Sequence, residues 1–373
     1  MPLYYAILSG LHPTLPEAEL RGILESEGFV YRIVESLDQA VVFECNCSSS
    51  SWIAERAGLV HETGRLISIA DAEPEAVAEE LRLNPPCRLL SGRSARIVFV
   101  RLRGYAKAVV PSDLAVQIAR RIHAYMERQG CSLSPRGPET ILVAVTQGAA
   151  LIGVREGVKP RKLLASHRPS RRPFTHPGGL EPSIARVFVN LSRASPRRGK
   201  YLDPFCGTGG FALEAQTIGV ETVCGELSTG KAKGAKTNLH HYPGAANTTI
   251  VAWDATKLPL RPETIASIGT DPPYGRSISL HGKTLENLLE NFLNEAARIL
   301  RPGGYLAYAT PHWAEREAIE KTRQAGLQLL EKHYMRVHGS LTRIIIVSRK
   351  PLGPNPYTQH PASMEKPQGR RQR

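Results

Sequence analysis

Residues 201–210 read YLDPFCGTGG, a short apolar strand that ends at Asp203 and turns through glycines into a helix. Glycines permit the tight backbone geometry of such a turn and let a ligand approach the backbone closely. From residue 183 onward, apolar strands and amphipathic helices alternate regularly around this stretch. The alternation predicts an α/β fold with a mostly parallel, doubly wound sheet, whose ligands bind at the carboxyl edge of the strands.

The expected elements of this sheet follow from the alternation of apolar runs. The expected strands cover 200–203, 221–226, 248–252, 265–270, 304–310, 328–336 and 342–348. The expected helices cover 183–193, 210–218, 229–240, 284–300 and 313–325.

The glycine-rich turn differs from that of a dinucleotide fold, which shows GxGxxG and binds pyrophosphate at a helix N-terminus. Here Asp203 opens the turn and presents a negative charge to the pocket. That charge suits the ammonium and sulfonium groups of S-adenosylmethionine and does not suit pyrophosphate. We therefore predict that Asp203 binds this cofactor, together with Phe205, Gly207, Thr208 and Gly209.

Two further acids follow the next two strands. Glu226 ends the strand at 222–226, where a carboxylate can accept hydrogen bonds from both ribose hydroxyls. Asp254 follows the strand at 248–252, and its carboxylate, with the Ala255 amide beside it, is placed to bind the adenine. Each acid could instead be a surface residue at a strand end. Three acids at three successive strand ends favour the cofactor site.

Residues 271–274 read DPPY and follow the fourth strand. The two prolines fix an extended turn and remove two backbone donors, which leaves carbonyls free to accept hydrogen bonds. Asp271 and the Pro272 carbonyl can each take one proton of an exocyclic amine, and Tyr274 offers a flat face for stacking on a base. A rigid loop without chemistry is the alternative for this motif alone. After the three acids, we predict Asp271, Pro272 and Tyr274 as the catalytic residues.

The distribution of charge points to a nucleic acid partner. The formal net charge is +14, and residues 86–200 alone hold 22 Lys and Arg against 5 Asp and Glu. Such a block is a plausible footprint for a phosphate backbone, although any single arginine could lie on a solvated face. The candidate RNA contacts are Arg93, Arg96, Arg101 and Arg103 in this block, and Arg276, His338 and Arg343 beyond it. For His338 an ordinary surface turn remains the alternative.

The chain of 373 residues, 42% of them hydrophobic, predicts two or three domains with substantial cores. The expected parts are an α+β unit (1–80), a second α+β unit (81–160), a linker rich in Arg, Pro and Gly (161–182), the doubly wound domain (183–352) and a basic flexible tail (353–373). In the first two units we expect strands at 4–8, 40–44, 97–102, 141–145 and 150–154, and helices at 15–27, 50–58 and 112–129.

Other site classes find little support. No apolar run approaches the ~20 residues that cross a bilayer, and the N-terminus lacks a signal peptide, so we expect a cytoplasmic location. The six cysteines show no CxxC pair, and we expect no metal site. Cys206 fits a small turn residue better than a nucleophile, since no histidine lies near it in sequence. The sequence leaves disulfides open.

These motifs resemble those of the archaeal tRNA guanine-N2 methyltransferases that modify guanine 10. The matching stretches are RPF at 172–174, HPG at 176–178, DPFCGTGG at 203–210, TDPPYG at 270–275 and VHGSLTR at 337–343. The resemblance implies a class I methyltransferase domain with a terminal β-hairpin, a ferredoxin-like N-terminal part and a THUMP domain that holds the acceptor end of tRNA. His176 lies in the segment just before the doubly wound domain, which could close over the cofactor, although an ordinary loop histidine is an equal alternative.

Several alternatives remain open at this point. A sister group that modifies guanine 6 carries Asn where this chain has Asp271, which favours guanine 10. An rRNA or DNA amino-methyltransferase would share the DPPY loop, but the basic block ahead of the cofactor loop favours tRNA. A tRNA-binding protein whose methyltransferase domain has lost its catalytic activity is disfavoured because all four strand-end acids are present. We expect a monomer apart from a possible small activating subunit, and the sequence does not determine the number of methyl groups.

Overall fold

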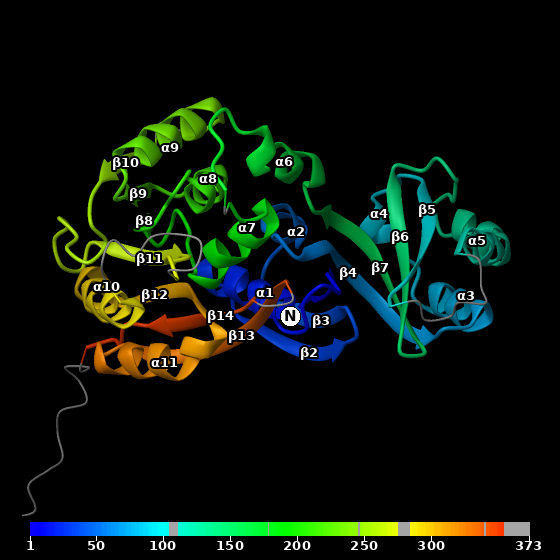
Figure 1. Ribbon diagram of the computed structural model, residues 1–373. Helices are drawn as coiled ribbons and strands as arrows, with labels where there is room; N and C mark the ends of the chain where they lie inside the picture. The colour runs from blue at the N-terminus through cyan, green and yellow to red at the C-terminus, as the bar shows by residue number, and fades with distance from the viewer. Residues whose placement is uncertain (104–110, 178, 245–246, 275–283, 339–340, 354–373) are drawn as a thin grey trace, which may run out of the picture.

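The computed structural model describes residues 1–103, 111–177, 179–244, 247–274, 284–338 and 341–353. Two units lie side by side, and each is built on a seven-stranded sheet (Figure 1). Among the described residues, no helix is both long enough and apolar enough to cross a membrane.

The first sheet spans both expected N-terminal units in the order β2-β3-β1-β4-β7-β6-β5. Its strands are β1 (Leu3–Leu8), β2 (Tyr31–Leu37), β3 (Ala40–Cys45), β4 (Val60–Asp71), β5 (Ala95–Arg101), β6 (Glu139–Thr146) and β7 (Ala149–Val158). The long strands β4 and β7 pair antiparallel, and β4 also pairs with β1, so one continuous sheet crosses the expected boundary near residue 80.

Helices cover this sheet in two groups. They are α1 (Leu15–Ser26) and α2 (Ser51–Arg56), then α3 (Pro74–Leu83), α4 (Cys87–Leu90) and α5 (Pro111–Arg128). Each group seals its own apolar core against one half of the sheet. A disulfide between Cys87 and Cys131 ties α4 to the segment after α5.

The segment at 161–182, expected as a linker, contains α6 (Arg161–Ser166) and the 3₁₀ helix η1 (Pro169–Arg171). His167 and Arg172 within it are buried, and the His167 ring contacts Glu214 of the second unit. The expected surface linker is therefore an ordered connection with side chains in the core.

The second sheet has the order β10-β9-β8-β11-β12-β14-β13. Its strands are β8 (Tyr201–Asp203), β9 (Thr222–Glu226), β10 (Thr248–Ala252), β11 (Ile265–Thr270), β12 (Leu300–Pro311), β13 (Gln328–His338) and β14 (Leu341–Arg349). The first five of these strands are parallel, whereas β14 and β13 form an antiparallel hairpin at one edge. This confirms the predicted α/β fold class, a Rossmann-like doubly wound sheet with a terminal β-hairpin. Each expected strand is present, and only β12 starts clearly earlier than expected.

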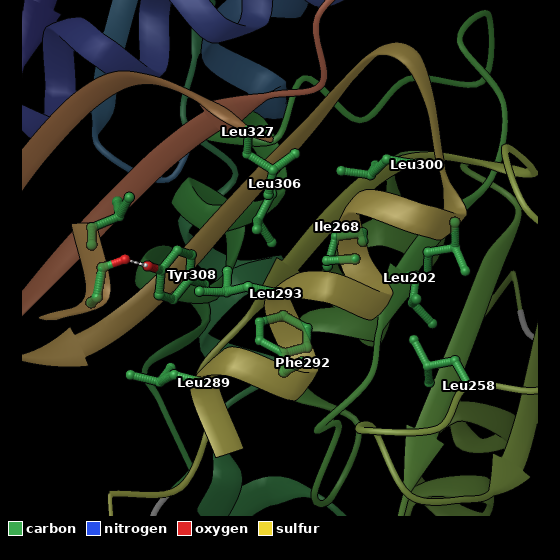
Figure 2. Close-up of a cluster of buried hydrophobic side chains, with 14 of the residues drawn as sticks. Leu202, Leu258, Ile268, Leu289, Phe292, Leu293, Leu300, Leu306, Tyr308 and Leu327 are labelled. Carbon is green, nitrogen blue, oxygen red and sulfur yellow. Dashed lines mark hydrogen bonds between the residues drawn. The ribbon is translucent and has the colours of Figure 1, made fainter. Parts of the chain in front are cut away.

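Helices pack on both faces of the second sheet. They are α7 (Pro182–Leu191), α8 (Gly210–Thr217), α9 (Thr229–His241), α10 (Leu285–Ile299), the 3₁₀ helix η3 (His312–Ala314) and α11 (Glu315–Gln324). Figure 2 shows one face, where Leu289, Phe292 and Leu293 of α10 meet Ile268 and Leu306 of the sheet. The cores on the two faces hold the parallel strands so that their carboxyl ends form one edge.

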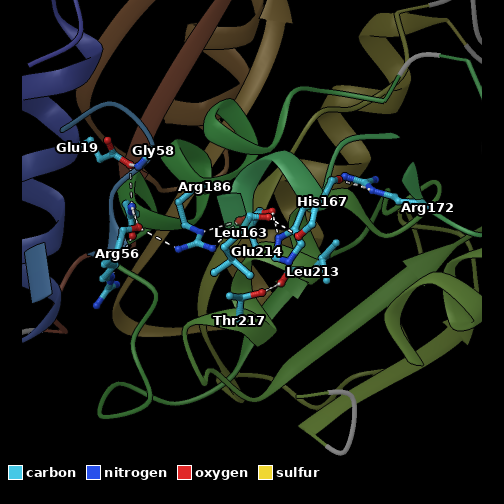
Figure 3. Close-up of polar contacts among 12 residues, drawn as sticks. Glu19, Arg56, Gly58, Leu163, His167, Arg172, Arg186, Leu213, Glu214 and Thr217 are labelled. Carbon is cyan, nitrogen blue, oxygen red and sulfur yellow. Dashed lines mark hydrogen bonds and ion pairs between the residues drawn. The ribbon is translucent and has the colours of Figure 1, made fainter. Parts of the chain in front are cut away.

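The two units share a buried contact through α7. Leu15 and Leu59 of the first unit belong to the same apolar cluster as Phe188 of α7. The Glu19 carboxylate accepts hydrogen bonds from the Gly58 and Leu59 amides and from the Asn190 side chain (Figure 3). The units are therefore packed together rather than connected only by chain.

Candidate active site

Four acidic residues lie at the carboxyl edge of the second sheet. Asp203 ends β8 and Glu226 ends β9, while Asp254 and Asp271 follow β10 and β11. Because β10, β9, β8 and β11 are parallel neighbours, their carboxyl ends lie side by side. The structure thus brings together the four acids that the sequence places at successive strand ends.

Asp203 is completely buried beneath the glycine-rich loop. Its Oδ1 accepts hydrogen bonds from Thr270 Oγ1 at 2.7 Å and from the Phe205 amide at 3.2 Å. Its Oδ2 has no hydrogen-bond partner among the described residues. Burial raises the pKa of Asp203 to about 7, and the nearby charges of Glu226 and Asp271 act in the same direction. An enclosed carboxylate with one unpaired oxygen fits a positively charged group of a ligand.

The loop after Asp203 has a backbone that only glycine adopts readily. Gly207 and Gly209 have φ of +52° and +85°, and Gly209 caps the N-terminus of α8. A Cβ on Gly207 would meet nothing within 4 Å, so the loop is open on that side. A disulfide joins Cys206 in the loop to Cys224 in β9, a link that the sequence left open. The loop is therefore held against β9 and presents an open backbone surface.

Glu226 is fixed by backbone amides. Its Oε2 accepts a hydrogen bond from Gly207 N at 3.0 Å, and its Oε1 accepts one from Ser228 N at 2.9 Å. Each oxygen keeps a second lone-pair direction for a ligand hydroxyl. Next to it, Trp253 packs on Gly225, where a Cβ would collide with the indole. Sequence reasoning missed Trp253, although an aromatic residue directly before Asp254 was a usable signal.

The Asp254 side chain stabilises the turn that follows β10. Its Oδ1 accepts hydrogen bonds from the Thr256 amide at 2.9 Å and from Thr256 Oγ1 at 2.7 Å. Ala255 between them is buried. The acid stands at the strand end where the sequence placed it, and contact with an adenine stays a prediction.

Asp271 is held from two sides. Arg343 Nη2 of β14 lies 3.1 Å from its Oδ2, and the Tyr274 hydroxyl donates a hydrogen bond to its Oδ1. The Arg343 guanidinium also lies 5.8 Å from the centre of the Tyr274 ring. Burial raises the pKa of Asp271 to about 6, and the Arg343 charge partly opposes this rise. Asp271 and Tyr274 thus contact each other, and Arg343, which the sequence placed among the RNA contacts, lies against both.

Comparison with known proteins agrees with this geometry. Residues 169–345 match the model of the RMKL-like methyltransferase domain family. A tRNA (guanine(10)-N2)-dimethyltransferase from Methanothermobacter thermautotrophicus is 34% identical over 343 residues, which cover 91% of this chain and 97% of that protein. The chain belongs to the tRNA (guanine(10)-N2)-dimethyltransferase family.

Two further comparisons extend over nearly the whole length. The protein of the same name from Pyrococcus abyssi is 27% identical and covers 92% of this chain and 99% of its own. The crystal structure of TrmN from Thermus thermophilus has a TM-score of 0.53 at 22% identity, covering 93% of this chain and 99% of that chain. The second unit is thus a methyltransferase domain, and the fold continues through the first unit.

In this member of the dimethyltransferase family, the RPF stretch contacts the glycine-rich loop through the Asn238 side chain. The Phe174 amide donates to Asn238 Oδ1 at 2.8 Å, and Asn238 Nδ2 donates to the carbonyls of Phe174 and Thr208. His176, predicted beside the cofactor, is exposed and its Nδ1 lies 2.8 Å from the Pro177 carbonyl. Phe174 rather than His176 therefore connects this segment to the loop.

The candidate RNA contacts are divided between the units. In the first unit, Arg93 pairs with Glu139, Arg96 donates to the Gly137 carbonyl, and Arg103 pairs with Asp38. Arg96 and Arg101 lie on β5, whereas Arg93 precedes this strand and Arg103 follows it. Arg276 falls outside the described residues, and only the backbone of His338 is described. Arg343 was expected at the RNA surface, but its side chain is only 12% exposed and pairs with Asp271.

Proposed function

We propose that the chain transfers methyl groups from S-adenosylmethionine to the exocyclic N2 of guanine 10 in tRNA, and that it adds two of them. One observation carries the proposal: the Asp271–Tyr274 loop stands beside Asp203 and Glu226 at one sheet edge. A group that grips a base amine therefore neighbours a site suited to a cationic nucleotide-like cofactor. Family membership supports tRNA as the substrate.

The residues present fit S-adenosylmethionine. When bound, this cofactor supplies a methyl group activated by a sulfonium. The unpaired, buried Oδ2 of Asp203 suits its positive amino-acid end, and the fixed Glu226 carboxylate suits the ribose hydroxyls. The open side of Gly207 leaves room for its approach, and Asp254 with Ala255 would bind the adenine. Phe205, Thr208 and Gly209 complete the proposed cofactor site.

The target amine would be held by the DPPY loop. In the first transfer Asp271 and the Pro272 carbonyl accept one N2 proton each, and in the second Asp271 accepts the single proton left on N2-methylguanine. In both transfers this directs the nitrogen lone pair toward the methyl carbon. Tyr274 stacks on the guanine. As the nitrogen–carbon bond forms, the carbon–sulfur bond breaks with its electron pair left on sulfur. The nitrogen then loses a proton, and a carboxylate with a pKa near 6 is a competent acceptor.

The first unit would hold the tRNA, with ferredoxin-like (1–80) and THUMP (81–160) parts. A cavity of about 650 Å³ lies where β7 leads into α6, and both basic and apolar side chains line it. Lys159, Arg161 and Lys162 are among the basic ones, and Leu102 and Leu142 among the apolar ones. Cations beside apolar side chains suit the backbone and bases of RNA. Arg93, Arg96, Arg101 and Arg103 would add phosphate contacts on and beside β5.

The test uses the purified chain alone, labelled S-adenosylmethionine and a tRNA transcript. We expect N2,N2-dimethylguanosine at position 10 by mass spectrometry of digested tRNA, and none in a transcript with adenine at position 10. Methylation at guanine 6, or of DNA alone, would contradict the proposal. A reaction that needs an added protein would identify a small activating subunit.

The same assay is applied to the variant Asp271→Ala. We expect this substitution to abolish methyl transfer to tRNA while calorimetry still detects cofactor binding, because in the proposed site Asp271 contacts the base and not the cofactor. Loss of both activities would contradict the separate roles given to Asp203 and Asp271.

A further inference from the structure

Arg343 makes none of the proposed contacts to the cofactor or the base, yet it lies against the Asp271 carboxylate. In the sheet register, Thr270 stands opposite Tyr308, and Arg343 stands opposite Pro311 three residues farther along β12. The first residues of β14 therefore reach the carboxyl edge where Asp271 begins its loop. From there the Arg343 guanidinium lies 3.1 Å from Asp271 Oδ2, with the two side chains 12% and 14% exposed.

The surroundings of Asp271 give this contact its importance. The ionisable groups that the described elements turn toward Asp271 are Arg343 of β14, Tyr274 of the same loop and Asp203 at the end of β8. The Tyr274 hydroxyl donates a hydrogen bond to Asp271, and Asp203 adds negative charge when ionised. Arg343 thus supplies the positive charge that favours an ionised Asp271 in a buried setting.

We propose that Arg343 is a positioning residue for methyl transfer, which orients the Asp271 carboxylate and keeps it ionised to receive the guanine amine. This inference rests on the proposed function. Each carboxylate oxygen can accept two hydrogen bonds, so Arg343 on Oδ2 and the Tyr274 hydroxyl on Oδ1 leave room for an amine. A protonated carboxyl would lose acceptor capacity and present a proton toward the amine instead.

The contacts of Arg343 distinguish a positioning residue from an arginine that binds a phosphate of tRNA. A phosphate-binding arginine extends into solvent, and its loss weakens tRNA binding and lowers the dependence of binding on salt. Arg343 is nearly enclosed, pairs with a carboxylate and covers the Tyr274 ring. Its loss should therefore change the rate and pH dependence of transfer while leaving tRNA binding intact.

The experiment compares the wild type with Arg343→Gln, Arg343→Lys and the control Arg336→Gln. Arg336 is an exposed arginine on the other strand of the same hairpin. Single-turnover rates at saturating tRNA and cofactor are measured from pH 5.5 to 9. For Arg343→Gln we expect a rate at pH 7 about 10-fold lower or more, and an acidic limb moved up by about one pH unit or more. Arg343→Lys should restore part of both, and Arg336→Gln should change neither.

Two further readouts make the result decisive. Infrared difference spectra of each protein against its Asp271→Asn derivative report protonation of Asp271 directly, without activity. We expect this carboxyl to titrate at higher pH in Arg343→Gln. An unchanged titration and acidic limb, with a raised KM for tRNA and a smaller salt dependence, would overturn the proposal in favour of a phosphate contact. A wild type that leaves guanine 10 unmodified refutes the proposed function, whereas the infrared titration still decides whether Arg343 controls Asp271.

Discussion

The Asp203→Asn substitution tests the central electrostatic feature of the site. The wild-type carboxylate is completely buried, with two hydrogen bonds to Oδ1 and an unpaired Oδ2. An asparagine of the same shape keeps an oxygen for the Thr270 hydroxyl and the Phe205 amide, but it removes the charge. We expect the variant to be more stable than the wild type without cofactor, and to lose cofactor binding.

The magnitude follows from the pKa of Asp203, which burial raises from 3.8 to about 7. This rise corresponds to about 4 kcal/mol of destabilisation once the carboxyl is ionised. Between about pH 4 and pH 7 the folded protein holds a proton that the unfolded chain has released. The stability contributed by this group is therefore full below pH 4 and falls by about 1.4 kcal/mol per pH unit up to pH 7.

The assay is thermal unfolding of both proteins at pH 5 and pH 8, with and without S-adenosylmethionine. Without cofactor, the Tm advantage of Asp203→Asn should be several degrees larger at pH 8 than at pH 5. Cofactor should raise the Tm of the wild type and leave that of the variant unchanged. A variant with the same relative stability at both pH values would refute the buried charge, and a variant that still binds cofactor would refute its role.

Three further predictions concern the rest of the chain. Glu226→Gln replaces one carboxylate oxygen by an amide that faces a backbone N–H, and calorimetry should show cofactor affinity about 10- to 100-fold lower. Arg186→Met leaves Glu214 buried without its 2.6 Å ion pair, and chemical denaturation should show a loss of about 3–5 kcal/mol. The double substitution of Arg93 and Arg103 by Gln removes two arginines that are 61% and 54% exposed. It should raise the KM for tRNA and lower its salt slope by about 2 with kcat unchanged, and an unchanged slope would argue against phosphate contacts there.

The methyltransferase fold could be predicted because its signals are local. Each parallel strand is a short buried apolar run, and each helix carries an apolar stripe, so the period of the pattern identifies the element. The strands β2 and β4 of the first sheet were missed for the opposite reason. β2 is an edge strand with few buried residues, and β4 has a polar start at 60–65, so neither shows a continuous apolar run.

The grouping of the acidic residues in the candidate site could also be predicted from the sequence, whereas their burial and their pairing could not. A parallel sheet brings successive strand ends to one edge, which is why Asp203, Glu226 and Asp271 could be grouped from order alone. The Asp271–Arg343 pair could not, because it depends on an antiparallel register between β12 and β14, 72 residues after the loop. The sequence also could not indicate that Asp203 is enclosed, since burial depends on what the loop folds over.

Buried polar contacts between α7 and α8 also connect the two units of the chain. Glu214 of α8 pairs with Arg186 and His167, and Arg186 donates to the Arg56 carbonyl in the first unit (Figure 3). Because α8 begins directly after the glycine-rich loop, the first unit supports the helix that anchors this loop. Removing the first unit would break the Arg186–Arg56 contact and expose the α7 cluster, and under the proposed function we expect cofactor binding to change along with tRNA binding. The proposed role of the first unit in tRNA binding is therefore separable only through surface substitutions such as those at Arg93 and Arg103, which leave this buried network intact.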